Sequence, residues 1–108
     1  MPDLTVCEML EMQRALQEKY RDQWEAIGPA AAQNKLLWML GECGEVIDIL
    51  KKQGGAAVAV PGAVREHFIE EMADVLMYYH DILLCCGVTA EELREIYIKK
   101  HKTNMHRW

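Results

Sequence analysis

Two pairs of acidic residues carry the chemistry that this sequence suggests most strongly. Glu42 and Glu45 form one pair, and Glu71 and Asp74 form the other. A spacing of three residues places both carboxylates of a pair on one face of a helix. Apolar residues surround both pairs, and a buried carboxylate is costly unless a cation neutralises it. Mg²⁺ suits such a site, with Mn²⁺ as a substitute, because it takes carboxylate oxygens and keeps waters for a phosphate substrate.

One acidic pair of this kind is also typical of a solvated helical surface. Two pairs on neighbouring amphipathic helices favour the metal interpretation. Gly41 and Gly44 add to it, since a glycine inside a helix costs about 1 kcal/mol relative to alanine. Such glycines indicate a close backbone approach or space for a ligand.

The elements that position these acids are predicted to be four helices. Capping boxes at Thr5–Glu8 and Thr89–Glu92 begin the first and the last helix. Glycines, one of them followed by proline, end the first three helices. The expected spans are about 5–27, 31–53, 63–86 and 89–103. Residues 56–62 are expected to form a loop because Pro61-Gly62 and the lack of a partner argue against a strand. The fold class is therefore all-α, a four-helix bundle.

Length and composition limit the remaining possibilities. The 108 residues form a single domain, 1–108, of which 51% are hydrophobic. So small a domain cannot bury all of these side chains, so we expect a homodimer or a dimer of dimers that completes the core between copies. The net charge of −5 argues against nucleic-acid binding. Without a signal peptide, a membrane span or a disulfide spacing, the protein is expected to be cytoplasmic with reduced cysteines.

Cationic, amide and aromatic side chains share helical faces with the acids or lie on the last helix. Lys35 and Trp38 lie on the face that carries Glu42 and Glu45, and the last helix carries a polar stripe. That stripe consists of Lys100, Asn104 and Arg107. Acids that hold a metal, with cations that neutralise phosphate oxygens, are the parts of a magnesium–polyphosphate site. Two plainer interpretations stay open: Trp38 as a core side chain, and the C-terminal cations as partners of the helix dipole.

The order of these motifs resembles the all-α nucleoside triphosphate pyrophosphohydrolases, the MazG-like group to which all-α dUTPases and dCTP pyrophosphatases are related. The similar stretches are residues 41–46, residues 70–76 and the ending Lys100-x-x-x-Asn104-x-x-Arg107-Trp108. Residues 10–16 are similar to the dUTPase branch, and the resemblance covers about residues 13–108.

This resemblance implies hydrolysis of a nucleoside triphosphate, such as dCTP or dUTP, to the monophosphate and pyrophosphate. The four acids would bind Mg²⁺, and Glu45 or Glu42 would activate the attacking water. Lys100 and Arg107 would stabilise phosphate charge, with a hydrogen bond from Asn104. Candidates for base recognition are Trp38, Gln13, Asn34 and Trp24.

One departure from the family and two alternatives follow. Gly41 stands where many family members carry a further acid, which changes the expected metal contacts. A phosphoribosyl-ATP pyrophosphatase has a similar acid pattern but would want more cations near the acids. A non-catalytic helical assembly module would need neither metal nor acids, and would tolerate Glu45→Gln.

Overall fold

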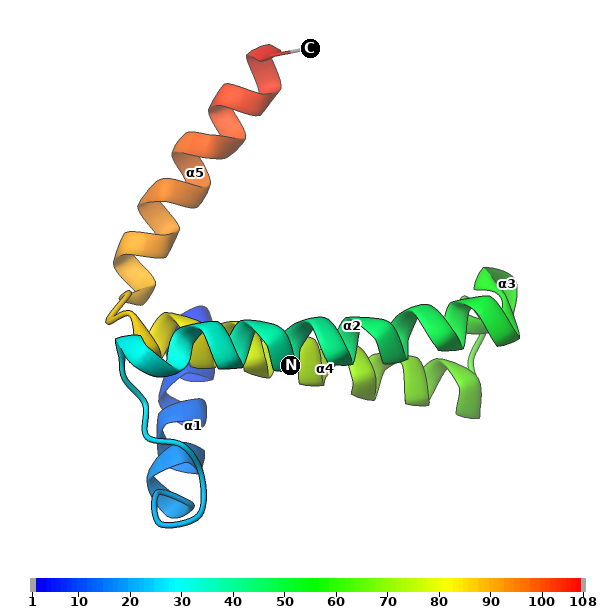
Figure 1. Cartoon of the computed structure of the whole chain (residues 1–108). Coiled ribbons are helices and arrows are strands. Elements are labelled where there is room, and N and C mark those ends of the chain that lie inside the picture. Colours follow the sequence, from blue (N-terminus) through cyan, green and yellow to red (C-terminus); the bar gives the residue numbers. More distant parts are fainter. Residues whose placement is uncertain (1, 108) are drawn as a thin grey trace.

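The computed structural model describes residues 2–107, and these residues fold into helices without a strand (Figure 1). The elements are α1 (Val6–Lys19), the 3₁₀ turn η1 (Pro29–Ala31), α2 (Ala32–Gln53), α3 (Gly55–Val58), α4 (Ala63–Cys85) and α5 (Ala90–Arg107). The predicted all-α class is confirmed. Trp108, which ends the stretch similar to the pyrophosphohydrolases, lies outside the described residues.

Local sequence explains where these helices begin and end. Thr5 Oγ1 accepts the Glu8 amide proton at 3.1 Å while Glu8 Oε1 accepts that of Thr5 at 3.0 Å, so the first capping box is formed. The second box, before α5, has the same two distances. Gly54 ends α2 with φ of 84°, a left-handed conformation that favours glycine.

Three predicted boundaries are wrong. The first helix ends at Lys19 instead of near residue 27, because the chain tightens into turns in which the Tyr20 and Trp24 rings stack at 4.6 Å. Residues 55–58 form the short helix α3 inside the expected loop, where consecutive alanines favour a helical turn. The last helix continues past residue 103 to Arg107.

Helices α2 and α4 lie antiparallel and side by side and form the main packed unit (Figure 1). Val46 and Ile49 of α2 and Leu84 and Cys85 of α4 are buried. Helix α1 crosses this pair and packs on α4, whereas α5 packs by its first turns near α1 and projects away from the pair. No residue of α5 is buried. The predicted four-helix bundle is therefore not confirmed within one chain.

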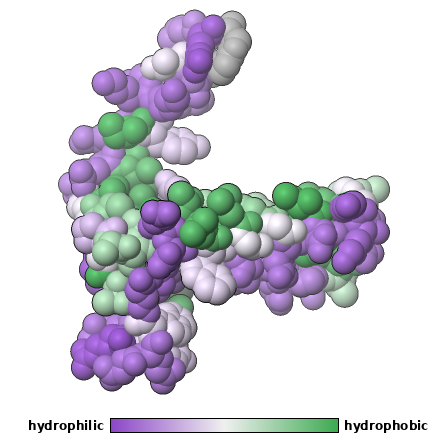
Figure 2. Space-filling view, in the orientation of Figure 1, coloured by the Kyte–Doolittle hydropathy of each residue, from purple (hydrophilic) through white to green (hydrophobic). Residues whose placement is uncertain are grey.

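The chain leaves much apolar surface open. Its radius of gyration is 16.1 Å, against about 13 Å for a compact domain of this length. Its accessible surface is 8437 Å², against about 6,100 Å² for a compact monomer of 12.4 kDa. Figure 2 shows part of this apolar surface along α2. The outer face of α2 exposes Leu36, Leu37, Leu40, Ile47 and Leu50. Among the described residues, no helix is long and apolar enough to cross a membrane.

Candidate metal centre

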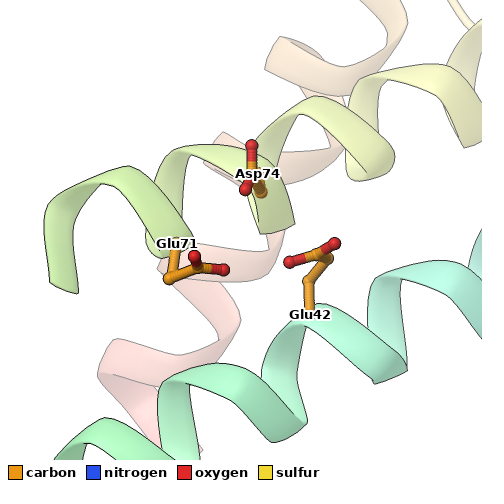
Figure 3. A group of neighbouring side chains, drawn as sticks. All are labelled: Glu42, Glu71 and Asp74. Atoms are coloured by element: carbon orange, nitrogen blue, oxygen red, sulfur yellow. The ribbon is translucent and has the colours of Figure 1, made fainter. Parts of the chain in front are cut away.

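Three of the four predicted acids converge between α2 and α4. Glu42 projects from α2 toward Glu71 and Asp74 of α4 (Figure 3). One carboxylate oxygen from each lies within 4.8 Å of the others, and all three residues are half-buried. Ligand oxygens around one Mg²⁺ span about 4.2 Å at most, because the metal–oxygen distance is about 2.1 Å. A small rotamer adjustment would bring this carboxylate triad to that spacing.

Electrostatics within the carboxylate triad favour an added cation. Burial raises the pKa of Glu42 most, followed by the hydrogen bond that its protonated carboxyl donates to Glu71 and by the charges of Asp74, Glu71 and Glu45. Its neighbours therefore oppose ionisation. His67 is the basic side chain beside the triad, with Nε2 at 3.3 Å from Glu71 Oε1, and it carries charge only when protonated. The all-oxygen donor set and this uncompensated charge both fit a hard divalent cation.

Glu45, the fourth predicted ligand, lies outside the carboxylate triad. It is exposed, one helical turn beyond Glu42, and borders a separate shallow cavity with Lys52 and His67. Its charge is still close enough to contribute to the raised pKa of Glu42. Glu45 is therefore placed beside the three converging acids and not among them.

A cavity of about 400 Å³ lies beside the carboxylate triad; Asp74 forms part of its wall, whereas Glu42 and Glu71 do not line it. Trp24, Trp38 and Tyr78 supply aromatic surface around it. Trp38 is 63% exposed, so the interpretation of Trp38 as a core side chain is wrong. Burial raises the pKa of Tyr78 most, followed by the charges of Glu42, Asp81 and Asp74, so its hydroxyl stays protonated in neutral solution. The size of the cavity and its aromatic walls suit a small organic ligand.

Four buried polar residues line the part of this cavity remote from Glu42 and Glu71. They are Gln13 and Gln17 of α1, Lys35 of α2 and Asp81 of α4, here called the buried polar cluster. Gln17 Nε2 donates to Asp81 Oδ1 at 3.1 Å, and Lys35 Nζ lies 3.9 Å from Asp81 Oδ2. Burial raises the pKa of Asp81, while the Gln13 amide, the Lys35 charge, the Gln17 amide and His80 oppose the rise. Within the cluster, the Lys35 ammonium thus balances the charge of the Asp81 carboxylate.

The predicted phosphate-binding residues of the last helix do not reach the carboxylate triad in one chain. Lys100, Asn104 and Arg107 lie in the second half of α5, whose backbone does not approach that of α2 or α4 among the described residues. Lys100 and Arg107 are exposed. Asn104 is half-buried, and its Oδ1 is buried without a hydrogen-bond partner among the described residues.

Two residues of the buried polar cluster were missing from the predicted site. Asp81 carries a usable signal, because it follows Asp74 by seven residues just as Lys35 precedes Glu42 by seven. In antiparallel helices these offsets bring Lys35 and Asp81 opposite each other. Gln17 follows Gln13 by four residues on the apolar face of α1, a weaker signal. Of the other base-recognition candidates, Asn34 donates to Glu25 at 3.2 Å and does not line the cavity.

The two helical glycines are not explained by packing within the chain. A Cβ atom added to Gly41 or Gly44 would meet nothing within 4 Å. A close backbone approach inside one chain is therefore excluded, and the space beside these residues is open.

Comparisons with protein-family models, with curated proteins and with solved structures gave no match for this chain.

Proposed function

We propose that this chain is a Mg²⁺-dependent nucleoside triphosphate pyrophosphohydrolase that acts on a pyrimidine substrate such as dCTP or dUTP. The observation that supports it most is the convergence of Glu42, Glu71 and Asp74 beside a cavity with aromatic walls. The proposed type of reaction comes from the order of the sequence motifs, which resembles that of the MazG-like enzymes. A pocket of this size beside an oxygen-only cation site suits a nucleotide, whose phosphates need a dication and whose base needs apolar surface.

In this proposal Glu42, Glu71 and Asp74 hold the metal through their converging oxygens. Bound Mg²⁺ would polarise the phosphates and lower the pKa of a water. The raised pKa of Glu42 means that this carboxyl gives up its proton on metal binding, so affinity should rise with pH.

Glu45 is the better candidate for the general base. It lies one turn from Glu42, outside the three converging carboxylates, and it is exposed. Its carboxylate therefore keeps its acceptor capacity when Glu42 serves as a ligand. Accepting a proton from the attacking water would be its role.

We also propose that the working unit is a homodimer. The surface in excess of a compact monomer, about 2,300 Å² per chain, exceeds the roughly 800 Å² per partner that a stable interface needs. Helix α2 has a second apolar face, which includes Leu40 and Ile47. The open space beside Gly41 and Gly44 would let a second copy's helix approach closely. Two copies could build together the bundle that one chain leaves incomplete.

Dimerisation would also give the polar residues at the end of α5 a role. Lys100, Asn104 and Arg107 cannot serve the acids of their own chain in this arrangement, because α5 extends away from α2 and α4 (Figure 1). In a dimer the same residues could meet the phosphates bound by the partner copy.

The reaction is tested by a substrate panel. Purified protein with Mg²⁺ is incubated with the eight common nucleoside triphosphates and dUTP, and the products are separated by chromatography. Monophosphate and pyrophosphate should appear from one or a few substrates with wild type, and not with Glu45→Gln. Asp48→Asn, which alters an exposed acid one turn from Glu45, is the matched control and should keep activity. No turnover of any triphosphate would contradict the proposal.

The dimer is tested by light scattering and by mixing two inactive variants. Wild type should scatter as a dimer at micromolar concentration. Glu45→Gln and Arg107→Ala should each be inactive, yet a mixture should recover part of the activity, since one site of a mixed dimer keeps both groups. A monomeric mass, or no recovery in a mixture that does exchange subunits, would contradict a shared site.

A further inference from the structure

The buried polar cluster is placed where the base of a bound nucleotide would end. Lys35 precedes Glu42 by seven residues and Asp81 follows Asp74 by seven, so each pair is separated by about 10 Å along its helix. Lys35, Asp74 and Asp81 all line the same cavity. A nucleotide held at its phosphates beside Asp74 would extend its base toward the other two.

This end of the cavity holds one carboxylate and one ammonium as its charged hydrogen-bonding groups. Asp81 is 2% exposed, and Gln17 donates to its Oδ1 at 3.1 Å. The second oxygen, Oδ2, has the Lys35 ammonium 3.9 Å away, which is too long for a hydrogen bond. This end of the cavity therefore offers a carboxylate acceptor beside an ammonium that makes no hydrogen bond within the part of the chain that the structure describes.

We propose that Lys35 and Asp81 select cytosine as the base, an inference that rests on the proposed nucleotide-hydrolysing function. The 4-amino group of cytosine is the base donor that Asp and Glu accept. Next to it, N3 and O2 are two acceptors for the Lys35 ammonium. Gln17 holds the Asp81 carboxylate in place, and Gln13 also hydrogen-bonds to it.

The other bases fit this arrangement less well. Uracil and thymine carry one ring N–H between two carbonyl oxygens, so in the position that cytosine occupies they would place the 4-carbonyl against the Asp81 carboxylate. Guanine presents two adjacent N–H donors that call for both carboxylate oxygens, of which Oδ1 already accepts from Gln17. Adenine offers the same donor and one acceptor but has no oxygen for the remaining ammonium donors.

The first test alters the substrate and leaves the protein intact. With wild type and Mg²⁺, kcat/KM for dCTP should exceed that for dUTP. It should also exceed, by about 100-fold or more, that for the pyrimidin-2-one analogue, which lacks only the 4-amino group. Equal values for dCTP and the analogue would overturn the inference while leaving the hydrolase proposal in place.

The second test measures binding without turnover. CMP and UMP are titrated by calorimetry into wild type, Asp81→Asn and the exposed-site control Asp48→Asn. Wild type and the control should prefer CMP by tenfold or more, and Asp81→Asn should lose that preference, provided that its circular dichroism matches wild type. If wild type hydrolysed no triphosphate yet preferred CMP, the base site would stand and the hydrolase proposal would fail. Absence of any CMP preference in wild type would overturn the base site.

Discussion

The cavity beside α2 and α4, here called the α2–α4 groove, has the carboxylate triad at one end and the buried polar cluster at the other, and the two ends differ in how charge is balanced. At one end the carboxylate triad brings three half-buried acids together without a Lys or Arg partner among its ion pairs. At the other end the buried polar cluster surrounds one buried acid, Asp81, with an ammonium and two amides. Both ends use residues of α2 and α4, about two turns apart, and α1 adds Gln13 and Gln17 to the polar end. Under the proposed function the triad takes up an added cation, whereas Lys35 balances the charge of Asp81 within the chain.

The largest expected effect comes from removing one acid of the carboxylate triad. Asp74→Asn should lower kcat by about 100-fold or more, because a metal ligand is lost. In thermal melts, millimolar Mg²⁺ should raise the Tm of wild type but not of the variant. Asp48→Asn, an exposed acid on α2, should behave as wild type in both measurements. Full activity of Asp74→Asn would show that the triad is not the metal site.

At the other end of the groove the same kind of change should reduce stability. Lys35→Met leaves the Asp81 carboxylate buried without its cation, so the free energy of unfolding should fall by about 3 kcal/mol. Urea denaturation of the metal-free protein measures this.

Lys52→Met is the matched control for that measurement. Lys52 pairs with Asp48 at 3.6 Å on the surface, where the two side chains are 71% and 62% exposed. Its loss should cost less than about 0.5 kcal/mol. Equal effects of the two lysine variants would remove the distinction between the two ends of the groove.

A smaller effect should appear in the pH dependence of stability. The pKa of Glu42 is raised above its ordinary 4.5, so the folded state binds its proton more tightly than the unfolded state. This contribution is full below the ordinary pKa and is lost as pH rises through the folded pKa. It should be small, because solvent screens the charges around this half-buried carboxyl. Subtracting the denaturation curves of Glu42→Gln from those of wild type isolates it.

Saturating Mg²⁺ should reverse the sign of this difference, because the metal binds the deprotonated carboxylate. A difference curve that is flat both with and without Mg²⁺ would mean that Glu42 does not sense the other acids.

The sequence was sufficient for the all-α class and for all three acids of the carboxylate triad, to which it wrongly added Glu45. Glu71 and Asp74 share a helical face whatever that helix packs against, and helix caps are local, so both predictions needed only short-range rules. The position of Glu45 depends on how far α2 is rotated about its axis relative to α4, which spacing alone does not determine.

Features that depend on contacts distant in sequence were not predicted. Gln17 meets Asp81 across 64 residues because α1 crosses α4, and that crossing has no local signature. The direction in which α5 projects could not be predicted from the sequence either, because few contacts fix this helix to the rest of the chain. The homodimer and the metal stay predictions.

The isolation of α5 has a consequence for how the protein folds. Helices in proteins draw most of their stability from tertiary packing, and none of the 18 residues of α5 is buried. If a second copy supplies the missing contacts, the ordering of α5 becomes a bimolecular step. Refolding should then show a fast phase independent of concentration, as α2 and α4 associate, and a slower phase whose rate increases with protein concentration. Helix content would likewise fall on dilution below the dimer dissociation constant.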